Sequence, residues 1–171
     1  MMALPAPIRR FVIHEHRSSR LHYDFRLEID GVLKSWTIPK GPSMNPADRR
    51  LAIMVPDHTL AYIDFEGIIP EGTYGAGPVI VWDAGTFVIL DAVDPQTAIA
   101  DGRINFELHG KKVKGSFSLV LMRELPKGTG KEWLLIKSQD GFALPYYAIK
   151  SELTPARLAQ LQLREPSCTT E

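Results

Sequence analysis

Residues 14–28, HEHRSSRLHYDFRLE, contain histidines, a carboxylate and an arginine at a spacing that suits metal chemistry. Alternate side chains of a strand share one face, so His22, Asp24 and Arg26 would lie in a row, about 7 Å apart. His16 precedes a short polar connection, and a hairpin there would turn it toward His22 and Asp24. Two imidazoles and a carboxylate are a common metal set that leaves positions open for water and substrate. The pattern predicts a metal site.

Nitrogen and oxygen ligands without thiolate suit Mn²⁺, Zn²⁺ or Fe²⁺. Arg26 follows the carboxylate of Asp24 by two residues, and its planar guanidinium matches the oxygens of a phosphate. A metal and an arginine side by side indicate phosphate chemistry. The alternative interpretation is that this strand presents a polar face to water and that His16 is a turn residue.

A second polar stretch contains His58 and Tyr62. Either side chain could hydrogen-bond a phosphate or donate a proton to a leaving oxygen. The simpler interpretation of Tyr62, within an apolar run, is a core residue. His14 has the same strand parity as His16, so it either hydrogen-bonds a residue of the metal site or is an ordinary polar neighbour. His109, beside a glycine in a turn, is expected at the surface.

The elements that must position these residues are mostly strands. Polar and apolar residues alternate over 22–29, Asp30-Gly31 supplies a two-residue turn, and 32–38 forms the return strand. Further strands are expected at 51–55, 61–65, 79–83, 86–90, 104–108, 116–122 and 132–137. Turns are expected at 70–78, 83–85, 109–110 and 127–130. Many short strands joined by turns predict an all-β fold, a compact antiparallel β-barrel that leaves no open edge.

One or two short helices complete the expected fold. Residues 95–102 predict one helical turn, with Pro95 at its start and Gly102 at its end. Near the C-terminus, Thr154 suits an N-cap and Pro155 suits the first helical position. The loop PEGTYGAGP is rich in glycine but lacks the Lys-Ser/Thr ending of a phosphate-binding P-loop, so we interpret it as a turn.

The chain has 171 residues, enough for one domain with a sizeable core. We expect a β-barrel domain over residues 1–150, then a C-terminal helix and a disordered tail over 151–171. The net charge of zero conceals a polarity, because Lys and Arg exceed Asp and Glu by four in residues 1–50 and in 111–171, whereas residues 51–110 carry an acidic excess of eight. Basic ends brought together would suit a polyanion; the alternative is charge scattered over a solvated surface.

Composition excludes several classes of protein. No apolar run approaches the roughly 20 residues of a membrane span, so no membrane partner is expected. The N-terminal residues have no apolar stretch of signal-peptide length, and the single cysteine, Cys168, has no disulfide partner in the chain. A cytoplasmic location is the expectation.

Long, ordered blocks of this sequence resemble one known family, the 3′-phosphoesterase domain of bacterial DNA ligase D and its stand-alone relatives. The blocks are HEHRSSRLHYDFRLEIDGVLKSWTIPKGPS, DHTLAYIDFEGIIPEGTYGAG and VIVWDAGTF, followed more loosely by GRINFELHGKKVKGSFSLV and KEWLLIK. They extend over residues 11–138. The resemblance implies a compact β-barrel that removes a terminal 3′ ribonucleoside and a 3′-phosphate, leaving a 3′-hydroxyl, in repair by non-homologous end joining.

The resemblance also implies roles for individual residues. His16, His22 and Asp24 match the ligands of a manganese ion, with Zn²⁺ or Co²⁺ as other candidates. The groups that match phosphate contacts are Arg26, His58 and Tyr62. The implied partners are DNA or RNA-tipped DNA 3′ ends, together with DNA ligase, polymerase and Ku-like end-joining proteins.

The sequence departs from the family in two places. Relatives have a longer segment before the first motif, bearing Arg and acidic residues that contribute to the site, whereas ten residues precede Phe11 here. Arg9 and Arg10 are candidates to supply the missing charge. The position of His14 is usually a glutamine in relatives.

Two other functions fit part of the pattern. A non-catalytic module could bind DNA 3′ ends through the basic segments and sense a 3′-phosphate in the pocket. An iron-dependent oxygenase also uses H-x-D with a distant histidine on a β-barrel, but would leave His16 without a role and would not require Arg26.

Overall fold

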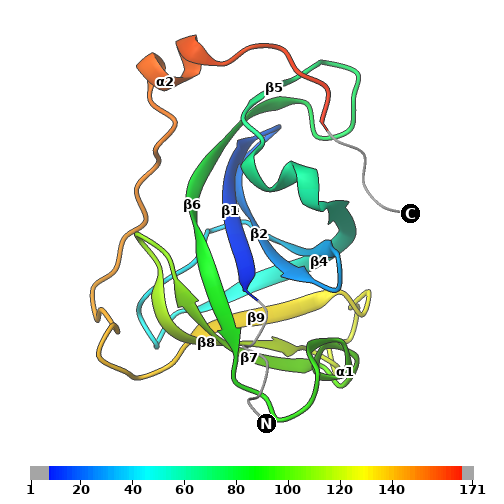
Figure 1. Cartoon of the computed structure of the whole chain (residues 1–171), viewed down its shortest axis with the longest axis vertical. Coiled ribbons are helices and arrows are strands. Elements are labelled where there is room, and N and C mark those ends of the chain that lie inside the picture. The colour runs from blue at the N-terminus through cyan, green and yellow to red at the C-terminus, as the bar shows by residue number, and fades with distance from the viewer. Residues whose placement is uncertain (1–7, 167–171) are drawn as a thin grey trace, which may run out of the picture.

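A computed structural model describes residues 8–166 of the chain (Figure 1). The strands are β1 (Arg9–Arg17), β2 (Leu21–Ile29), β3 (Val32–Ile38), β4 (Arg49–Thr59), β5 (Gly67–Ile69), β6 (Gly77–Ile89), β7 (Arg103–His109), β8 (Lys114–Leu121) and β9 (Glu132–Lys137). They pair antiparallel in the order β1-β2-β3-β4-β9-β8-β7-β6-β5, and pairing of β1 with β6 closes eight of them into a barrel. The predicted all-β barrel is confirmed.

Both short helices are confirmed. Helix α1 (Pro95–Ala100) begins after Asp94, whose side chain accepts a hydrogen bond from the backbone of Thr97. Helix α2 (Pro155–Gln160) begins after Thr154, which caps it through its side-chain oxygen as expected. No helix within residues 8–166 is long and apolar enough to cross a membrane.

The strand predicted at 61–65 is wrong: η1 (Leu60–Asp64) is a 3₁₀ helix. Its residues cover one face of the β1–β3 hairpins, where Tyr62 and Phe65 are 3% and 1% exposed. The apolar content that suggested a strand therefore reflects burial of this turn against a sheet. Tertiary packing decided the local structure here.

The prediction of two strands, 79–83 and 86–90, separated by a turn is also wrong. The 13-residue strand β6 runs through Asp83-Ala84-Gly85, with a bulge where Ile13 and His14 of β1 pair with it. The Asp83 carboxylate accepts hydrogen bonds from the backbone N–H groups of residues 111–113 and so folds the turn between β7 and β8. A polar residue that organises a neighbouring turn resembles a turn residue in the sequence.

Two apolar clusters lie on opposite faces of the β1–β3 hairpins. The barrel interior contains the larger one, in which the Phe25 ring packs against Trp36 and Phe106 at centroid distances of 6.4 and 5.7 Å. The smaller lies beneath η1 and β5 and includes Tyr62 and Phe65. Because both faces are covered, the polar face of β2 is buried rather than exposed to bulk water.

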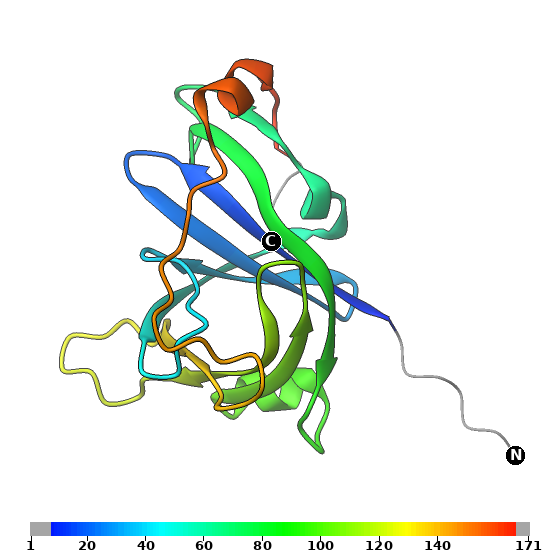
Figure 2. The ribbon, with the colours of Figure 1, turned by 90° about the vertical axis from the view of Figure 1, so that its left-hand side faces the viewer.

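The segment after β9 runs along the side of the barrel with little regular structure until α2 (Figure 2). The buried Glu15 carboxylate fixes it by accepting hydrogen bonds from the Ser151 hydroxyl and the Glu152 amide. Beyond α2, the Gln162 carbonyl accepts from the Ile68 amide, which places this segment beside β5. The predicted disordered tail falls largely outside the described residues, which end at 166.

Candidate metal centre

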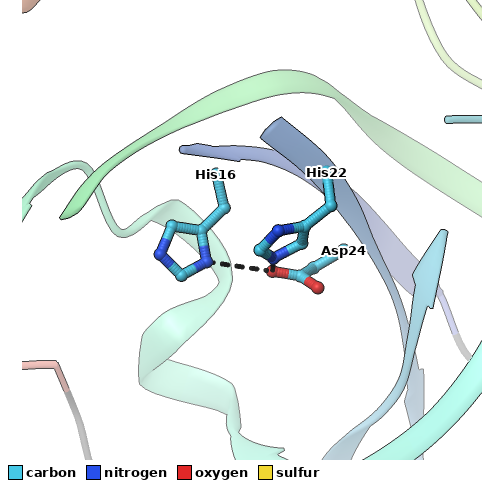
Figure 3. Close-up of side chains that lie close together, drawn as sticks. All are labelled: His16, His22 and Asp24. Carbon is cyan, nitrogen blue, oxygen red and sulfur yellow. Dashed lines mark ion pairs between the residues drawn. The ribbon is translucent and has the colours of Figure 1, made fainter. Parts of the chain in front are cut away.

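The register of the β1–β2 hairpin brings three predicted ligands together. His16 pairs with His22 across the hairpin, and His14 pairs with Asp24, so all four side chains share one face. His16 Nδ1 lies 3.5 Å and His22 Nε2 3.3 Å from the same carboxylate oxygen, Asp24 Oδ2 (Figure 3). One ligand atom from each of His16, His22 and Asp24 can be chosen so that all lie within 4.8 Å of one another.

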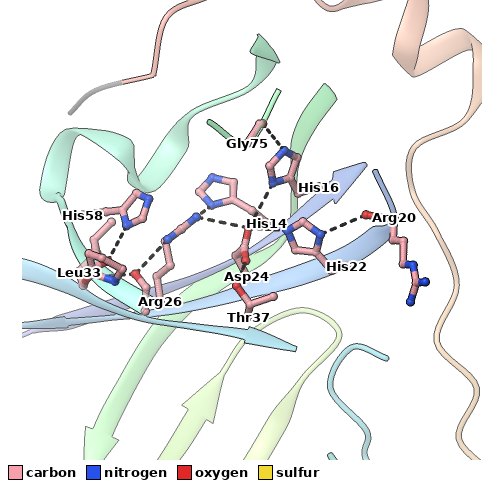
Figure 4. A network of polar contacts seen from close by, with 12 residues as sticks. His14, His16, Arg20, His22, Asp24, Arg26, Leu33, Thr37, His58 and Gly75 are labelled. Carbon is pink, nitrogen blue, oxygen red and sulfur yellow. Dashed lines mark hydrogen bonds and ion pairs between the residues drawn. The ribbon is translucent and has the colours of Figure 1, made fainter. Parts of the chain in front are cut away.

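Backbone carbonyls fix the tautomers of both imidazoles. His16 Nε2–H donates to the Gly75 carbonyl at 2.7 Å, and His22 Nδ1–H donates to the Arg20 carbonyl at 3.1 Å (Figure 4). Because a carbonyl can only accept, the proton of each neutral ring is on the nitrogen that faces away from Asp24. Each nitrogen that faces Asp24 therefore presents a lone pair when its ring is neutral, and donates to the carboxylate when its ring is protonated. This outer hydrogen bonding is typical of histidines that bind metals.

Asp24 is held as a carboxylate despite its burial. Thr37 Oγ1 donates to its Oδ1 at 2.8 Å, while its Oδ2 faces both imidazoles and the Arg26 guanidinium. Burial alone would raise the pKa of Asp24, but the histidine hydrogen bonds and the Arg26 charge outweigh it and hold the pKa well below its usual range. The same pairing raises the pKa of His22 against the opposing effect of burial.

The donor geometry fits a single divalent cation. Nitrogen and oxygen ligands about 2.1 Å from one ion, at angles between octahedral and tetrahedral, lie about 3.0–3.4 Å apart. The separations of 3.3 and 3.5 Å from Asp24 Oδ2 to the two imidazole nitrogens are close to that range. With neutral rings and an ionised carboxylate, the three side chains, whose ligand atoms lie within 4.8 Å of one another, can close around a metal ion.

Arg26 is fixed beside this ligand set. Its side chain is buried, and Nη1 donates to Ser35 Oγ at 2.9 Å while Nε donates to His14 Nδ1 at 3.1 Å. Its remaining nitrogen, Nη2, lies 3.5 Å from Asp24 Oδ2. The guanidinium is thus held at the edge of the metal ligands, in the position expected of a phosphate clamp. The Nε2 atom of His14 is buried and has no hydrogen-bond partner among residues 8–166.

His58 and Tyr62 lie on the other side of Arg26. The Tyr62 ring lies 4.9 Å from the Arg26 guanidinium carbon and 5.0 Å, between centroids, from the His58 ring. Burial and the Arg26 charge lower the pKa of His58 to about 4, so this imidazole is neutral at pH 7. Burial raises the pKa of Tyr62, against the opposing charge of Arg26, so the phenol keeps its proton.

Some expectations from the sequence are settled by these contacts. Tyr62 belongs to the smaller apolar cluster, so its interpretation as a core residue is confirmed, and its ring also faces the Arg26 guanidinium; its contact with a phosphate stays a prediction. His109 is about half exposed and lies beside Glu107 at the surface, as predicted. Arg10 pairs with Glu28 instead of reaching the metal ligands.

Four supporting groups were missed in the sequence: the hydroxyls of Ser35 and Thr37, and the carbonyls of Arg20 and Gly75. A signal for the hydroxyls existed, because the Asp30-Gly31 turn fixes a register in which Ser35 is opposite Arg26 and Thr37 is opposite Asp24. Nothing in the sequence indicated the two backbone carbonyls, because every residue type has a backbone carbonyl.

Comparison with known proteins places the chain in one family. The family model described as the DNA Ligase D 3′-phosphoesterase domain matches residues 14–121, which include the metal-ligand set, Arg26, His58 and Tyr62. The chain belongs to this family. Membership in this 3′-phosphoesterase family implies a hydrolase that acts on phosphate esters.

The relatives of this 3′-phosphoesterase domain are much longer proteins. The multifunctional non-homologous end joining protein LigD of Pseudomonas aeruginosa is 51% identical over 134 residues, which are 78% of this chain and 16% of the relative. LigD of Mycobacterium tuberculosis, named as a multifunctional non-homologous end joining DNA repair protein, is 46% identical over 125 residues, 72% of this chain and 15% of the relative. LigD of Mycolicibacterium smegmatis is 40% identical over 136 residues, 77% and 17% respectively. The chain thus spans about one sixth of each relative's length.

Proposed function

We propose that this chain is a manganese-dependent 3′-phosphoesterase that restores 3′-hydroxyl ends on nucleic acid during repair by non-homologous end joining. It removes a 3′-phosphate and, in a linked step, a terminal 3′ ribonucleoside. The observation that carries the proposal is the convergence of His16, His22 and Asp24 on one hairpin, with Arg26 locked beside them, in a chain of this family. DNA and RNA-tipped DNA 3′ ends are its substrates, and DNA ligase, polymerase and Ku-like proteins are its partners.

His16, His22 and Asp24 would hold the ion, which when bound would stabilise the negative charge that builds up on a phosphate oxygen. Mn²⁺ suits a set of two nitrogens and one oxygen, and Zn²⁺ or Co²⁺ can occupy the same donors. Arg26 donates its outward N–H groups to the other phosphate oxygens. Because Ser35 and His14 already orient the guanidinium, little side-chain entropy is lost when substrate arrives.

His58 and Tyr62 act on the protons of the reaction. The neutral His58 donates Nδ1–H to the Pro56 carbonyl at 3.0 Å, which leaves Nε2 as an acceptor. A phosphate dianion arriving nearby raises the pKa of this imidazole, so it takes up a proton and can pass it to the leaving oxygen. The protonated phenol of Tyr62 is a hydrogen-bond donor toward the phosphate.

The test is a gel assay with a 5′-labelled primer-template that ends in either a 3′-phosphate or a 3′ ribonucleotide. Manganese should convert both to a 3′-hydroxyl, and EDTA should stop the conversion. His22→Ala should abolish turnover, whereas His109→Ala, an equally drastic change at a surface histidine paired with Glu107, should leave it unchanged.

Three other outcomes carry distinct meanings. Removal of phosphate alone would restrict the activity to the monoesterase step. Binding of DNA ends without conversion in Mn²⁺, Zn²⁺ or Co²⁺ would refute the enzymatic function and support a non-catalytic module that binds DNA ends. Full turnover by His22→Ala would refute the assigned ligands.

A further inference from the structure

Two loops rim the candidate metal centre, and each fixes one of its histidines. The turn between β1 and β2 supplies the Arg20 carbonyl that accepts from His22, and the loop between β5 and β6 supplies the Gly75 carbonyl that accepts from His16. Figure 4 shows these two carbonyls on either side of the ligand set. Whatever binds to these loops therefore lies next to the reaction centre.

The two loops also pack against each other. A Cβ on Gly77 would lie 2.1 Å from the Arg17 carbonyl oxygen, and one on Gly75 would lie 3.4 Å from His16 Cε1, so the β5–β6 loop is pressed onto the end of β1. Both glycines have positive φ, 127° and 77°, which other residues rarely adopt. The close packing and the turn hydrogen bond from the Ala76 amide to the Thr73 carbonyl, at 3.1 Å, hold the loop in a defined shape.

This loop presents an aromatic ring to solvent. Tyr74 immediately precedes Gly75, and its side chain is 99% exposed. Tyrosine is usually at least partly covered in a folded protein, since its ring is apolar. A tyrosine exposed this fully gains nothing in folding, so its ring is available for a ligand. The ring is attached one residue from the carbonyl that orients a metal ligand.

The neighbouring turn adds positive charge. Arg17 and Arg20 are both exposed and lie at the two ends of the turn on which the Tyr74 loop rests. Exposed aromatic rings beside cationic side chains are the chemistry by which proteins hold single-stranded nucleic acid: bases stack on the rings and the backbone pairs with the cations. The rim thus matches a nucleotide at a strand end, whose base has a face free to stack.

We infer that Tyr74 stacks on a nucleobase at the 3′ end of the bound strand while Arg17 and Arg20 pair with its backbone phosphates. The inference deepens the proposed function, because it names how the strand end is gripped at the same site. Stacking on this loop holds the strand end beside the candidate metal centre, where Gly75 contacts His16, and does not require a particular base, since every base has a face to stack. Stacking uses only the aromatic ring of Tyr74 and does not need its hydroxyl.

Binding of a fluorescent primer-template with a 3′-phosphate, measured by anisotropy in EDTA to prevent turnover, tests the inference. Tyr74→Ala should weaken binding about 5- to 150-fold, the range that loss of one stacked base produces. Tyr74→Phe should bind like the wild type. Tyr146→Ala is the matched control, because Tyr146 is 97% exposed on the segment after β9, and it should also bind like the wild type. Arg20→Ala should reduce the slope of log affinity against log salt by about 0.7.

A second measurement detects the stack itself. 2-Aminopurine in the terminal nucleotide should lose fluorescence on saturation with wild-type protein or Tyr74→Phe, and should lose markedly less with Tyr74→Ala. A primer with an abasic terminal nucleotide should bind equally to wild type and Tyr74→Ala. Equal affinity and equal quenching for wild type and Tyr74→Ala would overturn the inference.

These readouts separate the inference from the proposed function. Binding that depends on Tyr74 without turnover in Mn²⁺ would refute the esterase and leave the stacking intact. Turnover in Mn²⁺ with binding indifferent to Tyr74 would support the esterase and refute the stacking.

Discussion

Replacing Thr37 by valine tests whether the hydroxyl behind Asp24 prepares the site for a metal. The substitution keeps the shape of the side chain and removes one donor, the Oγ1 that lies 2.8 Å from Asp24 Oδ1. A hydrogen bond to a charged acceptor contributes about 1.5–3 kcal/mol, and about 1.4 kcal/mol is a factor of ten. Loss of an outer-shell partner typically reduces metal affinity or activity 10- to 100-fold. Mn²⁺ affinity should therefore fall about 10- to 100-fold in Thr37→Val.

Isothermal titration of Mn²⁺ into the metal-free protein is the assay, and the chain offers a matched control. Thr59 is the last residue of β4 and pairs with Val32, at the opposite end of β3 from Thr37, and its Oγ1 is buried with no hydrogen-bond partner among the described residues. Thr59→Val makes the same chemical change without removing a bond, so Mn²⁺ affinity should be unchanged. Wild-type affinity in Thr37→Val, or an equal loss in Thr59→Val, would refute the argument that this hydroxyl orients the carboxylate.

Two further predictions concern other buried charges. Arg26→Lys should retain Mn²⁺ binding but lose at least tenfold in kcat, measured on a 3′-phosphate primer, because one ammonium cannot reach Ser35, His14 and substrate together; full turnover would contradict the clamp. Asp140→Ala should cost about 3 kcal/mol in urea unfolding and more than Lys137→Met, because it leaves the fully buried ammonium of Lys137 without its carboxylate. Burial opposes but does not cancel the Lys137 hydrogen bond, so the pKa of Asp140 is lowered in the folded protein. The stability that Asp140 contributes is therefore complete above its unfolded pKa near 3.8 and is lost as the pH falls through the lower folded pKa. The difference in unfolding free energy between wild type and Asp140→Ala should narrow in that pH range, and a constant difference would be evidence against this pair.

The sequence was most informative where a short turn fixes the register of a hairpin. The Asp30-Gly31 turn and the alternation in β2 were enough to place His22, Asp24 and Arg26 on one face. The connection at 17–20 allowed His16 to be paired with His22, as the structure has it. Local rules suffice for such residues because a two-residue turn leaves little freedom in the pairing.

The sequence was least informative where distant segments meet. The 3₁₀ turn of η1 has the composition of a strand because it is buried against β1–β3, and Asp83 resembles a turn residue because it binds a turn 30 residues away. The burial of Arg26 was hidden for the same reason, since η1 that covers it follows more than 30 residues later. Contacts of this kind depend on the whole fold and leave no periodic signal.

The charges of the site favour one substrate over another. Asp24 contributes one negative charge and Arg26 one positive charge, and His16 and His22 would coordinate as neutral rings, so a bound divalent ion would give the site a net charge of about +2. A terminal phosphate monoester dianion balances that charge, whereas an internal phosphodiester, with a single charge, leaves half of it uncompensated in a buried setting. Because the low pKa of His58 keeps this imidazole neutral until a dianion arrives, the free site carries no additional charge. We therefore expect kcat/KM in Mn²⁺ to be higher for removal of a 3′-phosphate than for removal of a 3′ ribonucleoside, and faster diester cleavage would show that contacts to the sugar outweigh this charge balance.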